Sequence, residues 1–169
     1  SRVIRPFFPE FDRIQACFDD ETRVDPLPET KDARGYVLPL YPMDAYSRLP
    51  QSFRGVPGRD YYAFTDLSLG EICKAGFCLG HKEGSIEIER MDSKLGRPTK
   101  ESRPIIVVDL VTRFIAFRGR QIEFTDIREF IVRLWKERGF TIKTVGTDSW
   151  QSVDFRQIMV RLGFNVDLV

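Results

Sequence analysis

Two aspartates that follow apolar stretches are the residues of this chain whose positions favour chemistry. Asp66 comes directly after the apolar run Tyr61–Thr65, and Asp148 comes directly after Phe140–Thr147. A carboxylate at the end of a central strand is costly to bury without a partner, so it usually binds a metal, pairs with a base or caps a turn. Which of these roles applies decides what kind of protein this is.

Of these three roles for Asp66 and Asp148, metal binding is the one that would give the protein a catalytic function. Oxygen ligands without a neighbouring histidine or cysteine favour hard cations such as Mg²⁺ or Mn²⁺. A pair of such ions about 3.5–4 Å apart activates water and stabilises the leaving oxygen in phosphodiester cleavage. The alternative for Asp66 is a turn cap bonded to the amide of Ser68 or Leu69, and for Asp148 it is a cap on the following helix.

The remaining candidates predict structural roles. Asp109 lies inside an apolar run, so we expect it to pair with a base, Arg113, rather than to act in catalysis. His81 has no identifiable serine or cysteine partner and is expected to be an ordinary histidine at a strand end. Trp135 is expected in the core, while Trp150 either stacks on a base or sugar of a nucleic acid or packs within the protein. The sequence contains neither a P-loop nor a dinucleotide-binding fingerprint.

Composition bounds the class of protein. The 169 residues suit one domain, and 26 basic against 25 acidic side chains give a net charge of +1, which neither indicates nor excludes a nucleic-acid partner. Three cysteines and one histidine form no disulfide framework and no zinc spacing, which is typical of a reducing, intracellular setting. No membrane span or signal peptide is visible. Because the chain begins with Ser-Arg and stops within an apparent strand, we expect a fragment of a longer protein.

The first part of the chain predicts a leader. Eight of the ten prolines precede residue 61, so we interpret residues 1–59 as a proline-rich leader or linker and residues 60–169 as the functional domain. One short helix is expected in the leader from the spacing of its apolar residues, which are Phe7, Phe8, Phe11, Ile14 and Phe18.

The second part predicts three strands followed by alternating helices and strands. The expected strands are 61–65, 75–81, 105–111, 140–148 and 164–169. One helix should run from a cap at Thr125 to Gly139, and a second from Ser149 or Ser152 to Gly163. Their expected inward residues are Ile127, Phe130, Ile131, Leu134 and Trp135, and then Phe155, Ile158, Met159 and Leu162.

A polar stretch, residues 82–104, separates the second and third strands. It predicts either an extension of the hairpin or a mobile insertion, and it carries the basic residues Lys94, Arg97, Lys100 and Arg103. Basic residues there suit contact with phosphate, although a solvated loop is the simpler interpretation. Further basic residues follow the third strand at Arg113, Arg118 and Arg120.

This succession of elements resembles the topology of the ribonuclease H-like fold, an α/β fold with a mixed sheet. Three strands form a meander, and helical crossovers make the later strands parallel. In that topology the first and fourth strands are neighbours at the sheet centre. Asp66 and Asp148 would then end adjacent parallel strands, at the edge where ligands of open α/β sheets bind.

Three segments resemble the nuclease domain of phage terminase large subunits, the motors that package viral DNA. They are Tyr62–Leu69 with Gly76–His81, Val107–Val111 with the helix that ends at Glu137–Phe140, and Val145–Ser152. The last segment, Val-Gly-Thr-Asp-Ser-Trp-Gln-Ser, is similar to the family pattern of a strand, an Asp, an aromatic residue and a Gln-Ser that opens a helix. The resemblance covers roughly residues 60–169 and depends on the combination of segments.

The resemblance implies a metal-dependent endonuclease that cuts concatemeric double-stranded DNA in the cytoplasm of an infected host cell. It maps Asp66 and Asp148 to catalytic metal ligands for two Mg²⁺ or Mn²⁺ ions, and a third acidic ligand beyond Val169, so we expect little cutting by this chain alone. Its partners would be an ATPase domain of the same polypeptide, the portal and the small terminase subunit. The residues expected to contact DNA are Lys100, Arg113, Arg118, Arg120 and Trp150.

Two other functions stay open at this point. The same fold could serve as a non-catalytic DNA-binding or motor-docking module, with Arg113, Arg118, Arg120 and the basic stretch 94–103 as its contact surface. It is also shared by actin- and sugar-kinase-like ATPases. Those proteins need a duplicated second domain and a late glycine-rich phosphate loop, and neither is visible in this sequence.

Overall fold

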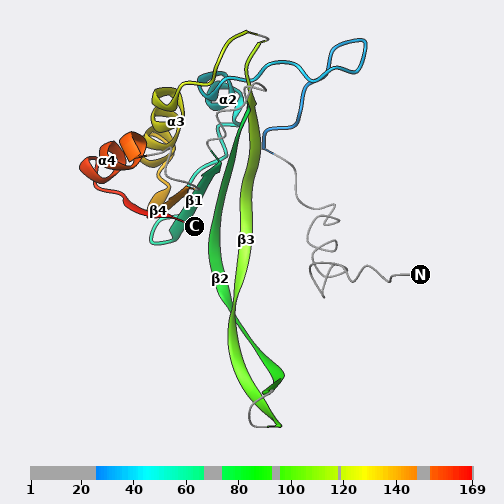
Figure 1. Cartoon of the computed structure of the whole chain (residues 1–169), viewed down its shortest axis with the longest axis vertical. Coiled ribbons are helices and arrows are strands. Elements are labelled where there is room, and N and C mark those ends of the chain that lie inside the picture. Colours follow the sequence, from blue (N-terminus) through cyan, green and yellow to red (C-terminus); the bar gives the residue numbers. More distant parts are fainter. Residues whose placement is uncertain (1–25, 67–73, 93–95, 118, 148–152, 169) are drawn as a thin grey trace.

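The central strand of the protein, β1, lies in the middle of a five-stranded mixed sheet. A computed structural model describes residues 26–66, 74–92, 96–117, 119–147 and 153–168 (Figure 1). In chain order its elements are α2 (Pro42–Arg48), β1 (Asp60–Asp66), β2 (Lys74–Asp92), β3 (Arg97–Ile115), α3 (Phe124–Lys136), β4 (Thr141–Thr147), α4 (Val153–Arg161) and β5 (Asn165–Leu168).

The sheet has the strand order β3-β2-β1-β4-β5. The pairs β1–β2 and β2–β3 are antiparallel, whereas β1–β4 and β4–β5 are parallel. The parallel pairs follow from the helices α3 and α4, since a chain that returns to a sheet through a helix re-enters it in the same direction. The predicted meander, and the predicted placement of the first and fourth strands side by side, are confirmed.

Helix α3 covers the sheet through one apolar face. Ile127, Phe130, Ile131 and Leu134 are all buried, as their spacing predicts. The other details differ from the prediction. The N-cap is Glu123 and makes no side-chain cap bond, whereas Thr125 Oγ1 accepts a hydrogen bond from Arg128. Trp135 is 37% exposed because it lies at the rim of this face, where its ring meets Phe164 edge-on at 5.1 Å.

Helix α4 packs through fewer residues than its pattern predicts. Phe155 and Met159 are buried, but Ile158 is only partly buried and Leu162 is 38% exposed. A nine-residue helix turns only two and a half times, so a narrow stripe is enough to hold it on the core. The predicted caps Ser149 and Ser152 lie outside the described residues, as does the predicted leader helix.

An aromatic cluster between α3 and the sheet forms the centre of the core. Phe130 meets Phe77 and Phe114 edge-to-face at 5.1 and 5.2 Å, and these two strand residues lie 6.3 Å apart. All three rings are at most 2% exposed. Such ring pairs add about 0.5–1.5 kcal/mol each beyond the burial of their area. The cluster therefore fixes α3 against β2 and β3.

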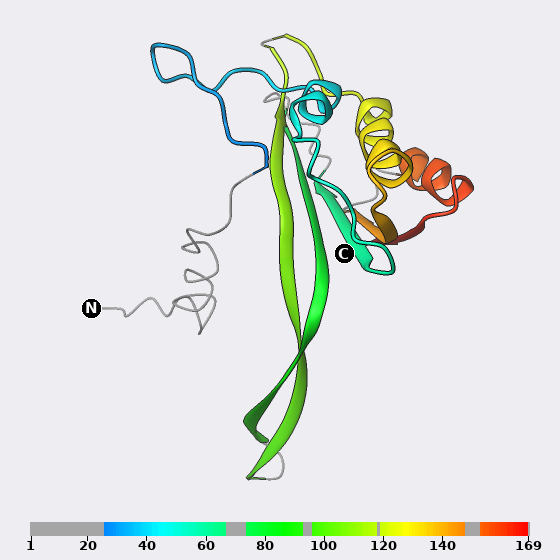
Figure 2. The ribbon, with the colours of Figure 1, turned by 180° about the vertical axis from the view of Figure 1, so that it is seen from behind.

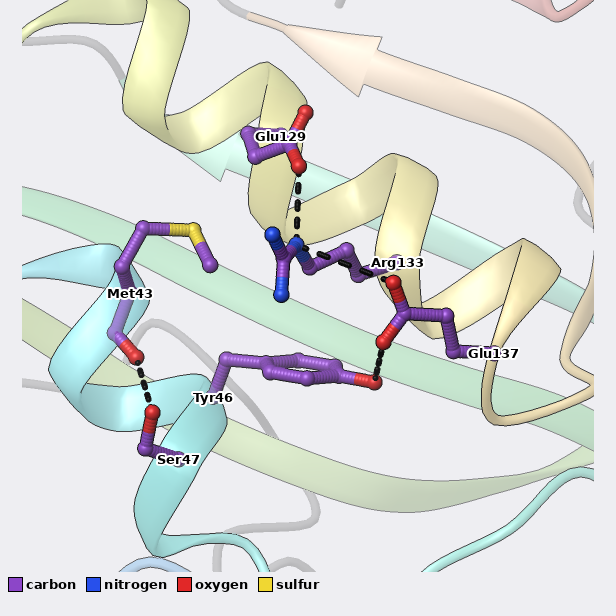
Figure 3. Close-up of polar contacts among 6 residues, drawn as sticks. All are labelled: Met43, Tyr46, Ser47, Glu129, Arg133 and Glu137. Carbon is purple, nitrogen blue, oxygen red and sulfur yellow. Dashed lines mark hydrogen bonds and ion pairs between the residues drawn. The ribbon is translucent and has the colours of Figure 1, made fainter.

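Helix α2, which the sequence pattern does not predict, packs against α3. The Tyr46 hydroxyl donates to Glu137 Oε2 at 2.8 Å, and Arg133 lies over the Tyr46 ring while its Nε donates to Glu129 (Figure 3). Burial, and then the bond to Glu137, raises the pKa of Tyr46. The core thus extends into the part interpreted as a leader, and its members there are Leu27, Leu40, Ala45, Tyr46 and Leu49.

The hairpin of β2 and β3 is much longer than predicted. Each strand has 19 residues, and their pairing continues out to Asp92 opposite Arg97. The outer half projects well beyond the rest of the protein (Figures 1 and 2). Of the two alternatives for residues 82–104, the hairpin extension is confirmed. Arg97, Lys100 and Arg103 accordingly lie on a strand rather than on a basic loop.

Candidate functional site

The candidate site lies where β1 and β4 end. Thr65 of β1 is the register partner of Thr147 of β4, and both threonines are fully buried. The Thr65 hydroxyl also donates to the Gly76 carbonyl at 3.0 Å, which ties the end of β1 to β2. Asp66 and Asp148 each follow one of these paired threonines in the sequence. From Tyr62 opposite Thr144 onward the two strands pair residue by residue, so they reach the same edge of the sheet together.

Asp66 is exposed, so the expectation that it is a costly buried charge is wrong. It is the last residue of β1, and the alternation of that strand places it on the side of the sheet away from α3. Its register partner is Gly76, which has no side chain to cover it. Asp66 makes no ion pair or hydrogen bond with another described residue, whereas the alternative partners Ser68 and Leu69 lie outside the described residues. Its carboxylate is accessible to a ligand from solvent.

Three of the predicted site residues cannot be placed. Asp148, Trp150 and Arg118 lie outside the described residues. The pairing of Asp148 with Asp66 therefore stays a prediction, and so does stacking by Trp150. What the structure adds is the position of Thr147, the residue directly before Asp148, next to Thr65.

Arg113 shares a cross-strand row with Asp66. Gly76 pairs with Asp66 on one side and with Arg113 on the other, so the two charged residues flank a glycine. The predicted pair of Arg113 with Asp109 is wrong, because Arg113 donates to Glu29 at 2.7 Å. Both side chains of that pair are about half exposed, and such pairs contribute roughly 0–1 kcal/mol. Arg113 could therefore exchange Glu29 for another anion at small cost.

Lys100 and Arg120, the other described residues expected to contact DNA, do not share the row of Asp66 and Arg113. Lys100 pairs in register with Glu89 on the outer half of the hairpin. It precedes Arg113 by 13 positions on one strand, which at about 3.3 Å per residue is roughly 43 Å. Arg120 is exposed in the connection between β3 and α3. The structure therefore brings Arg113 near Asp66 and leaves Lys100 remote from both.

A pair formed by the buried His81 and the partly buried Asp109 is the polar feature that the sequence did not reveal. His81 Nδ1 lies 2.6 Å from Asp109 Oδ2, and the His81 side chain is 3% exposed. Because a carboxylate oxygen accepts, the proton lies on Nδ1, and Nε2 has no partner in the described part of the chain. His81 is thus a buried residue in the middle of β2 and not an ordinary histidine at a strand end.

A β-bulge creates this pair. Leu79 is opposite Leu110 but Gly80 is opposite Val108, so Asp109 is an extra residue on β3. A side chain at Gly80 would lie 2.7 Å from the Val107 carbonyl, which explains the glycine there. The pattern of residue types carried no signal for the bulge, because the run Ile105–Val111 is apolar without alternation.

The donor chemistry at the strand ends fits a hard cation. Asp66 offers an accessible oxygen ligand, and Asp148 is the second oxygen ligand that the sequence predicts. Within the described ranges there is no group of three or more His, Cys, Asp or Glu side chains arranged to hold a metal. The described residues therefore supply one predicted ligand of the site.

These features define an α/β protein with a mixed five-stranded sheet and helices packed against it. Comparisons of the chain with models of protein families, with curated proteins and with solved structures found no match. No helix in the described part of the chain is long and apolar enough to cross a membrane.

Proposed function

We propose that this chain is a metal-dependent endonuclease domain of ribonuclease H-like fold, which cuts double-stranded DNA as the nuclease of a phage packaging motor does. The observation that carries the proposal is the register of Thr65 with Thr147 on adjacent parallel strands. It supports a shared site because the two candidate ligands each come one residue later. An ATPase domain, a portal and a small terminase subunit are the partners proposed by the same resemblance.

Each residue has a distinct role in this proposal. Asp66 and Asp148 would hold Mg²⁺ or Mn²⁺, which when bound supplies an activated water and stabilises the leaving oxygen of a phosphodiester. Arg113 would contact a phosphate of the DNA backbone, for which its guanidinium is suited. Arg113 lies in the same cross-strand row as Asp66, with Gly76 between them. This position supports the role, because a DNA phosphate bound by Arg113 would lie on the side of the sheet where Asp66 is exposed.

Metal binding is the first test, since it does not require cutting. Mn²⁺ broadens the nuclear magnetic resonance signals of amides close to it, so the amides of Thr65 and Thr147 should broaden at low Mn²⁺ concentration. Asp66→Asn, which keeps the shape but removes the charge, should abolish this effect. Asp60→Asn is the matched control, because Asp60 is an exposed acid at the other end of β1, 3.6 Å from Lys143. Equal broadening in both variants would contradict the site.

Cleavage of a supercoiled plasmid with Mg²⁺ or Mn²⁺, by a chain extended past Val169 so that the proposed third ligand is present, is the second test. Asp66→Asn and Asp148→Asn should each lower the nicking rate by about 100-fold or more, as expected for loss of a group that stabilises the transition state. Asp60→Asn should cut like the parent chain. If all three variants cut equally well, Asp66 and Asp148 are not the catalytic residues.

A second candidate function is DNA binding without cleavage. The exposed Arg113, which forms a surface ion pair with Glu29, favours it independently of any metal. Arg113→Ala should then weaken DNA binding about equally for all sequences and reduce the salt dependence by roughly one charge. Binding that depends on Arg113, together with no metal-dependent nicking, would favour this function over the nuclease.

A further inference from the structure

One face of the sheet carries large apolar side chains that no described element covers. Along β1 the odd-numbered residues face the helices and are buried, while the even-numbered ones are exposed. Tyr62 is 48% and Phe64 36% exposed on this central strand, and Val108 and Val111 of β3 are 42% and 56% exposed. We call these four residues, with Cys78, the open face.

The register makes the open face continuous. Phe64, Cys78 and Val111 form one row across β1, β2 and β3, and Tyr62, Gly80 and Val108 form the next. The helices α3 and α4 lie on the opposite side of the strands (Figures 1 and 2). Contiguous apolar patches of this kind on a soluble domain usually mark a contact surface. The exposure of Tyr62 and Phe64 on the central strand indicates that something packs there.

The chain enters the described structure at the border of the open face. Leu27 is buried, and Glu29 is held by Arg113 at 2.7 Å. Leu27 and Glu29 line one pocket of about 180 Å³ together with Val111 and Arg113. Val111 is also the last member of the row that starts at Phe64. The described chain therefore begins, at Pro26, beside the open face.

The sequence of that segment fits the face. Phe7, Phe11, Ile14 and Phe18 recur at the spacing of one side of a helix. Residues 19–25 can bridge up to roughly 23 Å when extended, whereas three strands are only about 10 Å across. We propose that residues 1–25 pack on the open face, with Phe11 and its apolar neighbours against Tyr62, Phe64 and Val111. The segment would then complete the sandwich of helix, sheet and helix within the same chain.

Cys78 provides a reporter at the centre of the face. Its alkylation in the full chain can be followed peptide by peptide by mass spectrometry, so that Cys17 and Cys73 do not interfere. Phe11→Asp should raise the rate at Cys78 by about tenfold, because a covered thiol reacts only when its cover opens. Ala16→Asp is the control, since it adds the same charge to the opposite side of the same segment; its rate should stay within about twofold of the parent.

Two outcomes overturn the proposal. Equal rates in the parent, Phe11→Asp and Ala16→Asp chains would show that the segment does not cover the face. Protection of Cys78 that rises with protein concentration instead would show that a second copy covers it. An unchanged melting temperature of Phe11→Asp excludes general unfolding as the cause of faster labelling. Because no readout involves metal or DNA, failure here leaves the proposed nuclease function unaffected.

A short bismaleimide linker gives an independent check. If the segment lies on the open face, Cys17 and Cys78 should cross-link within one chain and yield a product of monomer mass. Phe11→Asp should lower that yield by at least about fivefold, in proportion to the loss of the docked population. A product of dimer mass, or a yield that Phe11→Asp does not change, would contradict the proposal.

Discussion

The inner and outer halves of the β2–β3 hairpin share one pair of strands but differ in what their side chains contact. In the inner half Phe77, Leu79, Leu110 and Phe114 are at most 2% exposed and belong to the core, where Phe77 and Phe114 contact Phe130 of α3. In the outer half Ile86 is 51% and Met91 64% exposed, and both faces of the ribbon meet solvent. The backbone pairing continues through both halves.

The difference shows which interactions hold each half. The inner half is stabilised by buried aromatic and aliphatic area, at about 25 cal/mol per Å². The described residues of the outer half are held by the backbone ladder, by cross-strand side-chain pairs that contribute roughly 0.2–1 kcal/mol each, and by exposed contacts such as the ion pair of Arg103 with Glu101. Two-stranded ribbons of this kind are marginal by themselves. The inner half therefore fixes the register that the outer half continues. The packed part of the hairpin gives way to the exposed part at the two register shifts between Leu79 and Gly84.

Phe114→Ala should give the largest effect. Phe114 is fully buried against Phe77 and Phe130, so its loss leaves a cavity and should lower the free energy of unfolding by about 3–5 kcal/mol. Ile86→Ala in the outer half should change it by less than about 0.5 kcal/mol. Urea denaturation measures both values. Similar losses for the two variants would mean that the outer half is packed as tightly as the inner half.

Gly80→Ala should give the next largest effect. The new methyl group would lie 2.7 Å from the Val107 carbonyl oxygen, so the backbone at the bulge must shift, at a cost of about 1–3 kcal/mol. Gly84→Ala on the same strand is the control, since no atom lies within 4 Å of its methyl position. The same denaturation experiment distinguishes them. A neutral Gly80→Ala would contradict the close approach of the two strands.

Asp109→Ala should destabilise the protein by about 1–3 kcal/mol. It removes the hydrogen-bond partner that the buried His81 ring has among the described residues, and an unsatisfied buried donor is costly. Asp60→Ala removes an exposed carboxylate near Lys143 and should cost less than about 0.5 kcal/mol. Melting temperatures of both variants test the contrast. Equal shifts would show that the His81–Asp109 pair contributes no more than a surface pair.

The smallest effect concerns the thiol of Cys78. Burial, and then the nearby Asp109 carboxylate, raises the pKa of Cys78. Its alkylation rate should therefore rise with pH at higher values than that of a free cysteine, because only the thiolate reacts. Asp109→Asn should move the profile toward lower pH, because it removes the smaller of the two causes of the raised pKa. A profile that stays in place would exclude the carboxylate as a cause.

The site was predictable only in outline. The apolar runs that end at Asp66 and Asp148 indicated strands, and the alternation of strands and helices indicated that these strands are neighbours. The register of Thr65 with Thr147 and the exposure of Asp66 required the sheet itself. The predicted pairing of Arg113 with Asp109 was wrong, because ion pairs between distant residues depend on the tertiary structure and not on local spacing. Asp109 contacts His81 at the β-bulge, and Arg113 contacts Glu29 where the segment before α2 runs beside β3.

The sequence by itself determined the order of elements from β1 onward, the buried face of α3 from Ile127 to Leu134, and the glycine stops at Gly139 and Gly163, whose φ angles are 75° and 94°. Periodicity and glycine conformation act within a few residues, so they can be read locally. Only the tertiary structure decided the role of α2, the length of the β2–β3 hairpin and the burial of His81. These features depend on contacts between residues far apart in the chain, such as Tyr46 with Glu137 and His81 with Asp109.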